Sequence, residues 1–207
     1  MDSSDIVIMP KPDSISWEEI TELLHLAFAS HLENGLNYAA CTQTEEETRQ
    51  RVGDGMCMVA LINGELVGTA TLNFYRGVAH LGQVAVHPDF RKYGIGRKLQ
   101  AYILEDARNR KLSALVCDTS ERATEIVAWY LRTGWQKVGL ASGQTTNYYS
   151  IVFRKPVCGR KYTALEAGIR FYLSSCFWRL MLTEHGKIRK LSKPFYLLAR
   201  KIYRIVR

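Results

Sequence analysis

The 207-residue sequence predicts an α/β (α+β) domain with a central mixed, mostly antiparallel sheet flanked by helices, followed by a basic helical C-terminal extension. Three observations support this prediction. Strand-like runs lie both before and after helix-like runs, an Asn-Gly pair joins two apolar runs as in a β-hairpin, and basic residues gather near the end of the chain. This length allows one full hydrophobic core and an appendage, so we expect a domain over residues 1–157 and an extension over residues 158–207.

Local sequence signals predict four helices in the first part of the chain. Ser16 and Thr44 are each followed three residues later by Glu, which is the capping box that opens a helix. Apolar residues at helical spacing indicate the two later helices. The four predicted helices cover residues 16–34, 44–52, 96–110 and 121–132.

Short apolar runs bounded by turn residues predict the strands. They fall at residues 6–9, 56–62, 65–74, 78–86, 114–117, 135–140 and 148–153. Asn63-Gly64 is the residue pair that most favours a tight hairpin, and it joins the second run to the third. Pro88 ends the fourth run, because proline has no amide hydrogen to donate to a sheet. We therefore expect the central strands to form an antiparallel meander.

The basic charge of the chain is concentrated in its last 50 residues. The formal net charge is +8, but residues 158–207 contain 12 Lys or Arg and only Glu166 and Glu184, a net charge of +10. In residues 192–207 an apolar stripe lies beside a basic stripe at helical spacing, which suits an anionic membrane surface. Packing on the domain, a homodimer contact and nucleic acid are the alternatives, and nucleic acid is disfavoured.

Cysteine usage and the N-terminus predict a cytoplasmic protein without a metal site. The five cysteines form no C-x-x-C pair and have no histidine at metal-ligand spacing, and Cys57 and Cys117 lie in apolar runs that suit the core. No secretory signal is visible at the N-terminus, and charged residues interrupt the apolar stretch 163–182, which argues against a membrane span. A peripheral position at the inner membrane surface is the alternative that the basic extension suggests.

The most informative stretch joins the end of the fourth strand to a basic, glycine-containing turn and a helix. It reads Val84-Ala85-Val86-His87-Pro88-Asp89-Phe90-Arg91-Lys92-Tyr93-Gly94-Ile95-Gly96-Arg97. At such a junction backbone amides and the helix dipole can converge on a phosphate, and glycine permits close approach. A third glycine at Leu99 or a Gly-Lys-Ser/Thr run would indicate the two common nucleotide motifs, and both are absent. We therefore predict a pyrophosphate site.

This stretch resembles the acyl-CoA-binding motif of the GNAT superfamily of N-acetyltransferases, Arg/Gln-x-x-Gly-x-Gly/Ala, with Arg91, Gly94 and Gly96 at its fixed positions. The resemblance implies a GNAT fold and direct transfer of an acetyl group to the primary amine of a small molecule or peptide. The co-substrate it implies is acetyl-CoA or another acyl-CoA, with no metal. It also implies that the fourth strand splays from its neighbour and binds the pantetheine arm through its backbone. The implied cofactor-binding residues are Val84, Ala85, Val86, Arg91, Lys92, Tyr93, Gly94, Ile95, Gly96 and Arg97.

A second part of the resemblance lies at Tyr130, where Tyr-Leu-Arg-Thr-Gly-Trp resembles the family's Tyr-x-x-x-Gly-Phe signature. The resemblance implies that Tyr130 is the general acid, since a phenol can protonate the thiolate that leaves. The family's acidic base on the fourth strand falls near Gly82 here. His80 is the candidate that could relay a proton through water. Ala123 stands where the family commonly has an Asn at the start of the signature helix.

Other interpretations of these residues stay open. Gly94 and Gly96 could simply end a loop and start a helix, and Tyr130 could be a packed aromatic residue of its helix. The basic extension could bring a longer fatty acyl-CoA or a lipid-linked acceptor to the site at a bilayer. The chain could also be a non-enzymatic GNAT-fold protein that binds a membrane or a partner, although the glycines and Tyr130 favour the enzyme.

Overall fold

The computed structural model describes residues 6–75, 78–142 and 146–181. The chain divides into two compact units, the first made of Met1–Cys117 with Pro156–Gly159 and the second of Asp118–Lys155 with Arg160–Arg207. The helix predicted over residues 192–207 lies outside the described residues. The domain boundary predicted between residues 157 and 158 stays a prediction.

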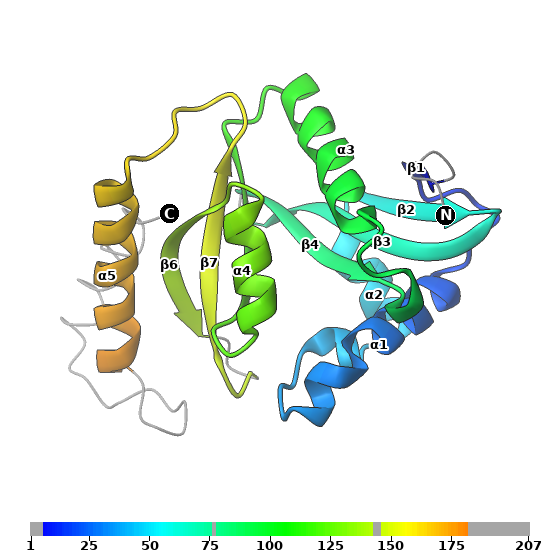
Figure 1. Ribbon diagram of the computed structural model, residues 1–207, viewed down its shortest axis with the longest axis horizontal. Coiled ribbons are helices and arrows are strands. Elements are labelled where there is room, and N and C mark those ends of the chain that lie inside the picture. Colours follow the sequence, from blue (N-terminus) through cyan, green and yellow to red (C-terminus); the bar gives the residue numbers. More distant parts are fainter. Residues whose placement is uncertain (1–5, 76–77, 143–145, 182–207) are drawn as a thin grey trace. The chain divides into compact units, whose positions relative to one another are not determined.

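The first unit holds most of the strands and the helices that precede residue 110 (Figure 1). Its strands are β1 (Ile6–Pro10), β2 (Met56–Ile62), β3 (Glu65–Tyr75), β4 (Val78–Val86) and the start of β5 (Ala114–Ser120). Its helices are α1 (Trp17–Glu33), α2 (Glu45–Val52) and α3 (Ile95–Asn109), with 3₁₀ turns at η2 (Ala39–Cys41) and η3 (Pro88–Phe90).

The second unit contains the end of β5 and the elements that follow it. These are α4 (Thr124–Arg132), β6 (Gln136–Ser142), β7 (Tyr149–Pro156) and α5 (Ala164–Met181). Among the described residues, no helix combines the length and the apolar character needed to cross a membrane.

Backbone pairing gives the strand order β1-β2-β3-β4-β5 in the first unit and β5-β7-β6 in the second, with β5 common to both orders. The pairs β1–β2, β2–β3, β3–β4 and β6–β7 are antiparallel. The pair β4–β5 is parallel, with His80 opposite Val116. The predicted class, a mixed and mostly antiparallel sheet flanked by helices, is confirmed.

Both predicted capping boxes are present. The Oγ atom of Ser16 accepts from the Glu19 amide at 3.1 Å, and the Glu19 carboxylate accepts from the Ser16 amide at 2.6 Å. That amide holds the pKa of the Glu19 carboxyl below its usual value. Thr44 and Glu47 make the same reciprocal pair at the start of α2. Each box satisfies amides that the first helical turn leaves free, so these helices begin where the sequence predicted.

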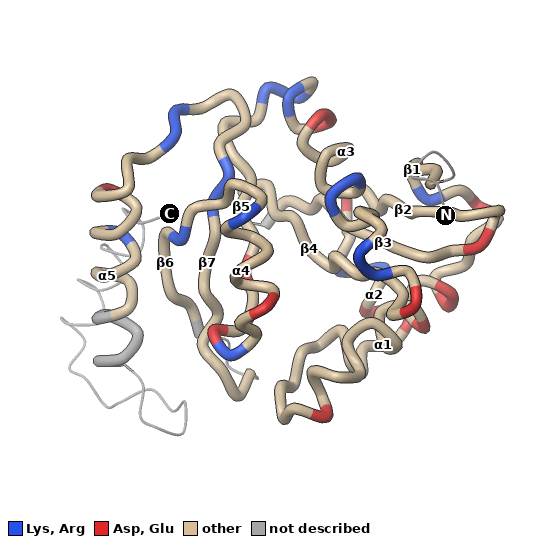
Figure 2. The backbone as a smooth tube through the Cα atoms, viewed as in Figure 1, with Lys and Arg blue, Asp and Glu red and all other residues tan. Residues whose placement is uncertain are grey.

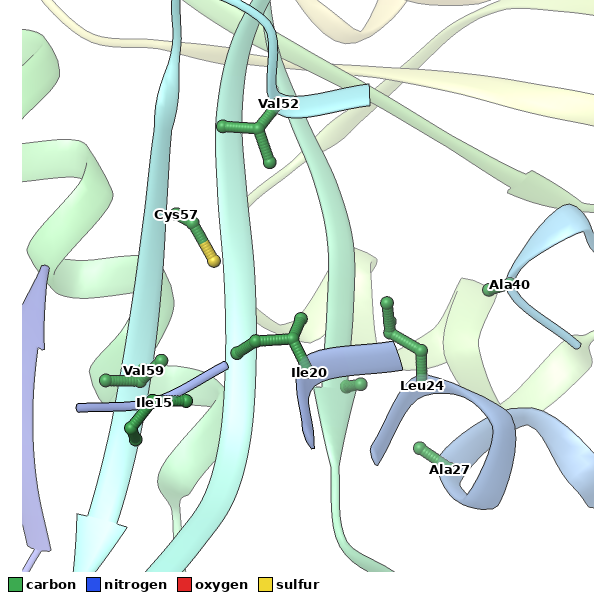
Figure 3. Close-up of a cluster of buried hydrophobic side chains, with 9 residues drawn as sticks. Ile15, Ile20, Leu24, Ala27, Ala40, Val52, Cys57 and Val59 are labelled. Carbon is green, nitrogen blue, oxygen red and sulfur yellow. The ribbon is translucent and has the colours of Figure 1, made fainter. Parts of the chain in front are cut away.

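The two faces of the first unit's strands pack against different helices. Cys57 and Val59 of β2 join Ile20 and Leu24 of α1 in one buried cluster (Figure 3). Successive side chains of a strand alternate between faces, and Gly68 lies on the other face, where an added Cβ would be 2.8 Å from Ile95 of α3. Helices α1 and α2 therefore cover one face of the meander and α3 covers the other.

The buried cysteines match their predicted role. Cys57 is 6% exposed and Cys117 is 1% exposed. Burial raises the pKa of the Cys57 thiol above its ordinary value, because a thiolate would lose hydration there. These thiols are small core side chains.

The predicted end of the fifth strand and the predicted start of the helix after it are wrong. The sequence predicted a strand at 114–117 and a helix from residue 121, but β5 continues to Ser120 and α4 begins at Thr124. The Glu121 amide donates to the carbonyl oxygen of Tyr149 at 2.9 Å, which keeps the chain extended beside β7. A pairing with a distant strand thus overrides the local preference for helix.

Hydrogen bonds between side chains and backbone join α5 and the residues before it to β6. Ser174 Oγ accepts from the Leu140 amide at 2.8 Å and donates to the Leu140 carbonyl oxygen at 2.7 Å. The Gln136 side chain bonds the amide and the carbonyl oxygen of Tyr162. Figure 1 shows α5 running alongside β6. The first part of the predicted extension is therefore an integral layer of the second unit.

Candidate functional site

Strand β4 pairs with β5 over a very short length. The parallel pairing has a single register position, His80 opposite Val116, although both strands are fully described. From Leu81 to Val86 the edge of β4 that faces β5 has no strand partner in the described ranges of the chain. This edge presents backbone N–H and C=O groups that a ligand can bond. The splay of the strand that the family resemblance implied stays a prediction.

A β-bulge lies within the same stretch of β4. Thr71 pairs with Gly82 and Thr69 pairs with Ala85, so β4 advances three residues where β3 advances two. An extra residue of this kind bends the strand and leaves part of the ladder unpaired, and bulges are common beside active sites. The bulge falls at Gln83 and Val84.

Gln83 is the unusual residue of the bulge. Its φ of 46° lies in the left-handed region, which a non-glycine residue rarely adopts. Both polar atoms of its side-chain amide are buried without a hydrogen-bond partner among the described residues. The sequence places Gln83 beside the position of the family's acidic base without indicating a role for it, but Gly82 inside an apolar run is a signal for a bulge.

The turn after β4 has the backbone geometry of an anion site. Lys92 (φ 72°) and Gly94 (φ 82°) are both left-handed, and Gly94 caps the N-terminus of α3. A helix N-terminus presents amide groups without intrahelical partners and the positive end of the helix dipole, and both attract an anion. A Cβ added at Gly94 would meet no protein atom within 4 Å, so the backbone there is open to a ligand.

Some of the predicted cofactor-binding residues have buried side chains, and others have exposed side chains. Ala85 and Ile95 are 3% and 1% exposed, so their side chains belong to the core and only their backbone can face a ligand. Arg91 donates from Nη2 to the Ala27 carbonyl oxygen at 2.7 Å, which braces the turn against α1. Figure 2 shows Lys and Arg along the turn that leads into α3, and the side chains of Lys92 and Arg97 are exposed.

Tyr130 lies in the second unit, in an aromatic cluster. It is 6% exposed, and its ring centroid lies 5.0 Å from that of Trp129, 5.5 Å from that of Trp135 and 5.1 Å from that of Phe153. Helix α4 and strand β7 thus hold the phenol ring in one place. Ala123, at the N-cap of α4, makes no side-chain capping bond.

The pocket found in the described structure does not contain the predicted site residues. A pocket of about 260 Å³ between α1 and β3 contains none of the predicted site residues; its lining residues are Glu19, Glu22, Leu23, Leu26, Glu65, Leu66 and His87. In the described part of the chain, no group of three or more His, Cys, Asp or Glu side chains is arranged to hold a metal ion.

Comparison with known proteins agrees with this geometry. Residues 17–141 match the model of the acetyltransferase (GNAT) family. The chain is 26% identical over 143 residues to the S-(2-succino)cysteine N-acetyltransferase of Bacillus subtilis strain 168, covering 63% of this chain and 87% of that protein.

Solved structures share the fold. A GNAT family acetyltransferase from Elizabethkingia anophelis with acetyl-CoA bound superposes with a TM-score of 0.57 at 19% identity, covering 73% of this chain and 98% of that chain. A GCN5-related N-acetyltransferase from Kribbella flavida gives a TM-score of 0.60 at 17% identity, covering 75% and 99%. Together with the open edge of β4 and the glycine turn, the family match shows that the chain belongs to the acetyltransferase (GNAT) family. It is an N-acetyltransferase, which moves the acetyl group of acetyl-CoA to an amine.

Proposed function

We propose that the acceptor is the primary amine of a small, amino-acid-like molecule, and that transfer takes place beside the bulged part of β4. The end of the β4–β5 pairing at His80 carries the placement of the reaction, because it leaves strand backbone open shortly before the Gly94 turn. The name of the Bacillus subtilis relative supports an acceptor of the amino-acid class.

The residues of the first unit fit acetyl-CoA, which supplies an activated thioester. The unpaired backbone of residues 84–86 suits the amide-containing pantetheine arm. The left-handed turn and the start of α3 suit the pyrophosphate, with the exposed charges of Lys92 and Arg97 beside it. The proposed cofactor-binding residues are Val84, Ala85, Val86, Arg91, Lys92, Tyr93, Gly94, Ile95, Gly96 and Arg97.

Two side chains are proposed to move protons. His80 takes the proton that the amine loses, since an imidazole can accept a proton near neutral pH. Tyr130 gives a proton to the sulfur that leaves, since a phenol is a hydrogen-bond donor. Its rigid aromatic surroundings suit a group that must be held in one orientation.

A panel of amines tests the acceptor. Release of free thiol from acetyl-CoA should be fastest with S-(2-succino)cysteine and related amino acids, and slower with an aminoglycoside, an amino sugar and a lysine-containing peptide. The matched comparison is S-(2-succino)cysteine whose amine is already acetylated. Preference for the peptide or the sugar would contradict the amino-acid class, and release with no amine would contradict the proposed function itself.

Replacing Gly94 by Ala should weaken acetyl-CoA binding. The new methyl group meets no protein atom but lies where the backbone approaches the cofactor, and losing one or two charge-assisted hydrogen bonds raises the dissociation constant about tenfold to a hundredfold. Gly64→Ala is the matched control, because Gly64 (φ 84°) is equally left-handed and equally open. Both variants should lose about 1 kcal/mol of stability. Equal affinities by calorimetry would remove Gly94 from the site.

Tyr130→Phe should lower kcat about a hundredfold, because the ring packing is kept and only the proton donor is lost. The affinity for acetyl-CoA and the melting temperature should stay close to those of the natural chain. Tyr102→Phe, at a 39% exposed position on α3, is the control and should leave kcat unchanged. An unchanged kcat in Tyr130→Phe would show that Tyr130 is only a packed aromatic residue.

A second proposal concerns the outer face of α5. Ala167 and Ser174 are buried on the inner face, whereas Leu165, Ile169, Tyr172 and Leu173 are 73%, 49%, 67% and 46% exposed on one opposite stripe. Residues 182–207, which follow directly, carry a net charge of +7. Exposed apolar side chains followed along the chain by concentrated positive charge are typical of proteins that lie on anionic membrane surfaces. We propose that this surface binds such a membrane.

The full chain should therefore co-sediment with vesicles containing phosphatidylglycerol and not with vesicles of phosphatidylcholine alone, and salt should weaken the binding. The double variant Leu165→Glu/Tyr172→Glu should lose binding. Leu32→Glu, at a 47% exposed position on α1, should keep it. Absence of vesicle binding by the natural chain would overturn the proposal. If light scattering shows a dimer of the natural chain and a monomer of the double variant, the face binds a second copy of the chain instead.

A further inference from the structure

Two buried threonines on the same face of β3 differ in what their hydroxyl groups contact. Thr69 is 0% exposed, and its Oγ1 donates to the carbonyl oxygen of Met58 at 3.0 Å. Thr71 is 1% exposed, and its Oγ1 has no hydrogen-bond partner among the residues that the structure describes. A buried hydroxyl without a partner costs stability, so such a group in a native fold needs a reason.

The surroundings of Thr71 suggest that reason. Backbone pairing sets Thr71 opposite Gly82. A Cβ atom added at Gly82 would lie 3.1 Å from Thr71 Oγ1 and 3.3 Å from Nδ1 of His80. Both atoms therefore lie on the side of Gly82 where a side chain would begin, immediately before the bulge at Gln83. Because glycine has no side chain there, a small polar group such as a water molecule or an amine that lies against Gly82 can bond to both.

Glycine at position 82 belongs to this arrangement. The family resemblance places an acidic base near this position, but any side chain there would begin within 3.1 Å of the Thr71 hydroxyl, closer than ordinary contact. A carboxylate would therefore require Thr71 or His80 to shift. The chain instead combines a hydroxyl and an imidazole beside a residue without a side chain.

We propose that Thr71 is a positioning residue for the removal of the amine proton, an inference that rests on the role proposed for His80. As the amine nitrogen bonds to the acetyl carbon and the carbon–sulfur bond breaks, the nitrogen loses one proton. Thr71 Oγ1 holds the water that takes this proton and passes one of its own to His80 Nδ1. The sulfur gains its proton from Tyr130, so every proton has a donor and an acceptor.

Thr71→Val tests the inference against a purely structural role, with Thr69→Val as the matched control on the same strand and face. Thr69→Val should lower the melting temperature, because it breaks a buried hydrogen bond, and should leave kcat unchanged. Thr71→Val should keep or raise the melting temperature, because it removes an unpartnered hydroxyl, while kcat falls about tenfold with the amine of highest turnover in the panel. The affinity for acetyl-CoA should not change in either variant.

A double-mutant cycle with His80→Ala separates this inference from the proposed function. If Thr71 acts through His80, Thr71→Val should have little further effect on kcat once His80 is Ala. Two results would overturn the role of Thr71 and leave that of His80. In the first, His80→Ala lowers kcat and Thr71→Val has no effect. In the second, both variants lower kcat and the double variant shows the product of the two single effects. An unchanged kcat in His80→Ala would overturn the role of His80 and this inference with it.

Discussion

Between Gly82 and Ala85, strand β4 has one residue more than the part of β3 with which it pairs, and the candidate site depends on that extra residue. The bulge turns Gln83 into the left-handed region just after the last position at which β4 pairs with β5. The backbone groups of a regular inner strand form hydrogen bonds with both neighbouring strands, whereas one edge of this stretch is without a strand partner in the described structure, and a ligand can bond there. The surrounding meander, with Met58, Leu72 and Leu81 almost fully buried, stabilises this irregular segment.

The same region contains groups that reduce stability. Thr71 Oγ1 and the Gln83 amide are buried without partners in the described structure, and each such group costs about 1 to 3 kcal/mol. Natural proteins keep costs of this size at functional sites, where a substrate supplies the missing contacts. Gly82 stands where the family commonly has a carboxylate, and the polar atoms beside it include the Thr71 hydroxyl and the His80 imidazole.

Helix α5 shows how a segment beyond the family's minimal domain becomes part of a unit. Its contacts with β6 include the Ser174 hydroxyl, which bonds both backbone groups of Leu140. That contact turns one helix face toward β6 and leaves the stripe at Leu165 and Tyr172 exposed. A helix that is apolar on both faces is normally covered on both faces. The exposed apolar outer face of α5 therefore suggests a binding surface.

Features with local causes could be predicted from the sequence. Ser16 and Thr44 begin their helices because a capping box involves residues only three apart, and the Asn63-Gly64 hairpin and the Gly94 turn follow from backbone preferences at a few positions. The family motif added the cofactor and the reaction. Only the tertiary structure decided the rest, because the bulge at Gln83, the convergence of Thr71 with His80 and the bond from Ser174 to Leu140 join residues on different elements. Such contacts depend on strand register and helix docking, which no short stretch of sequence determines.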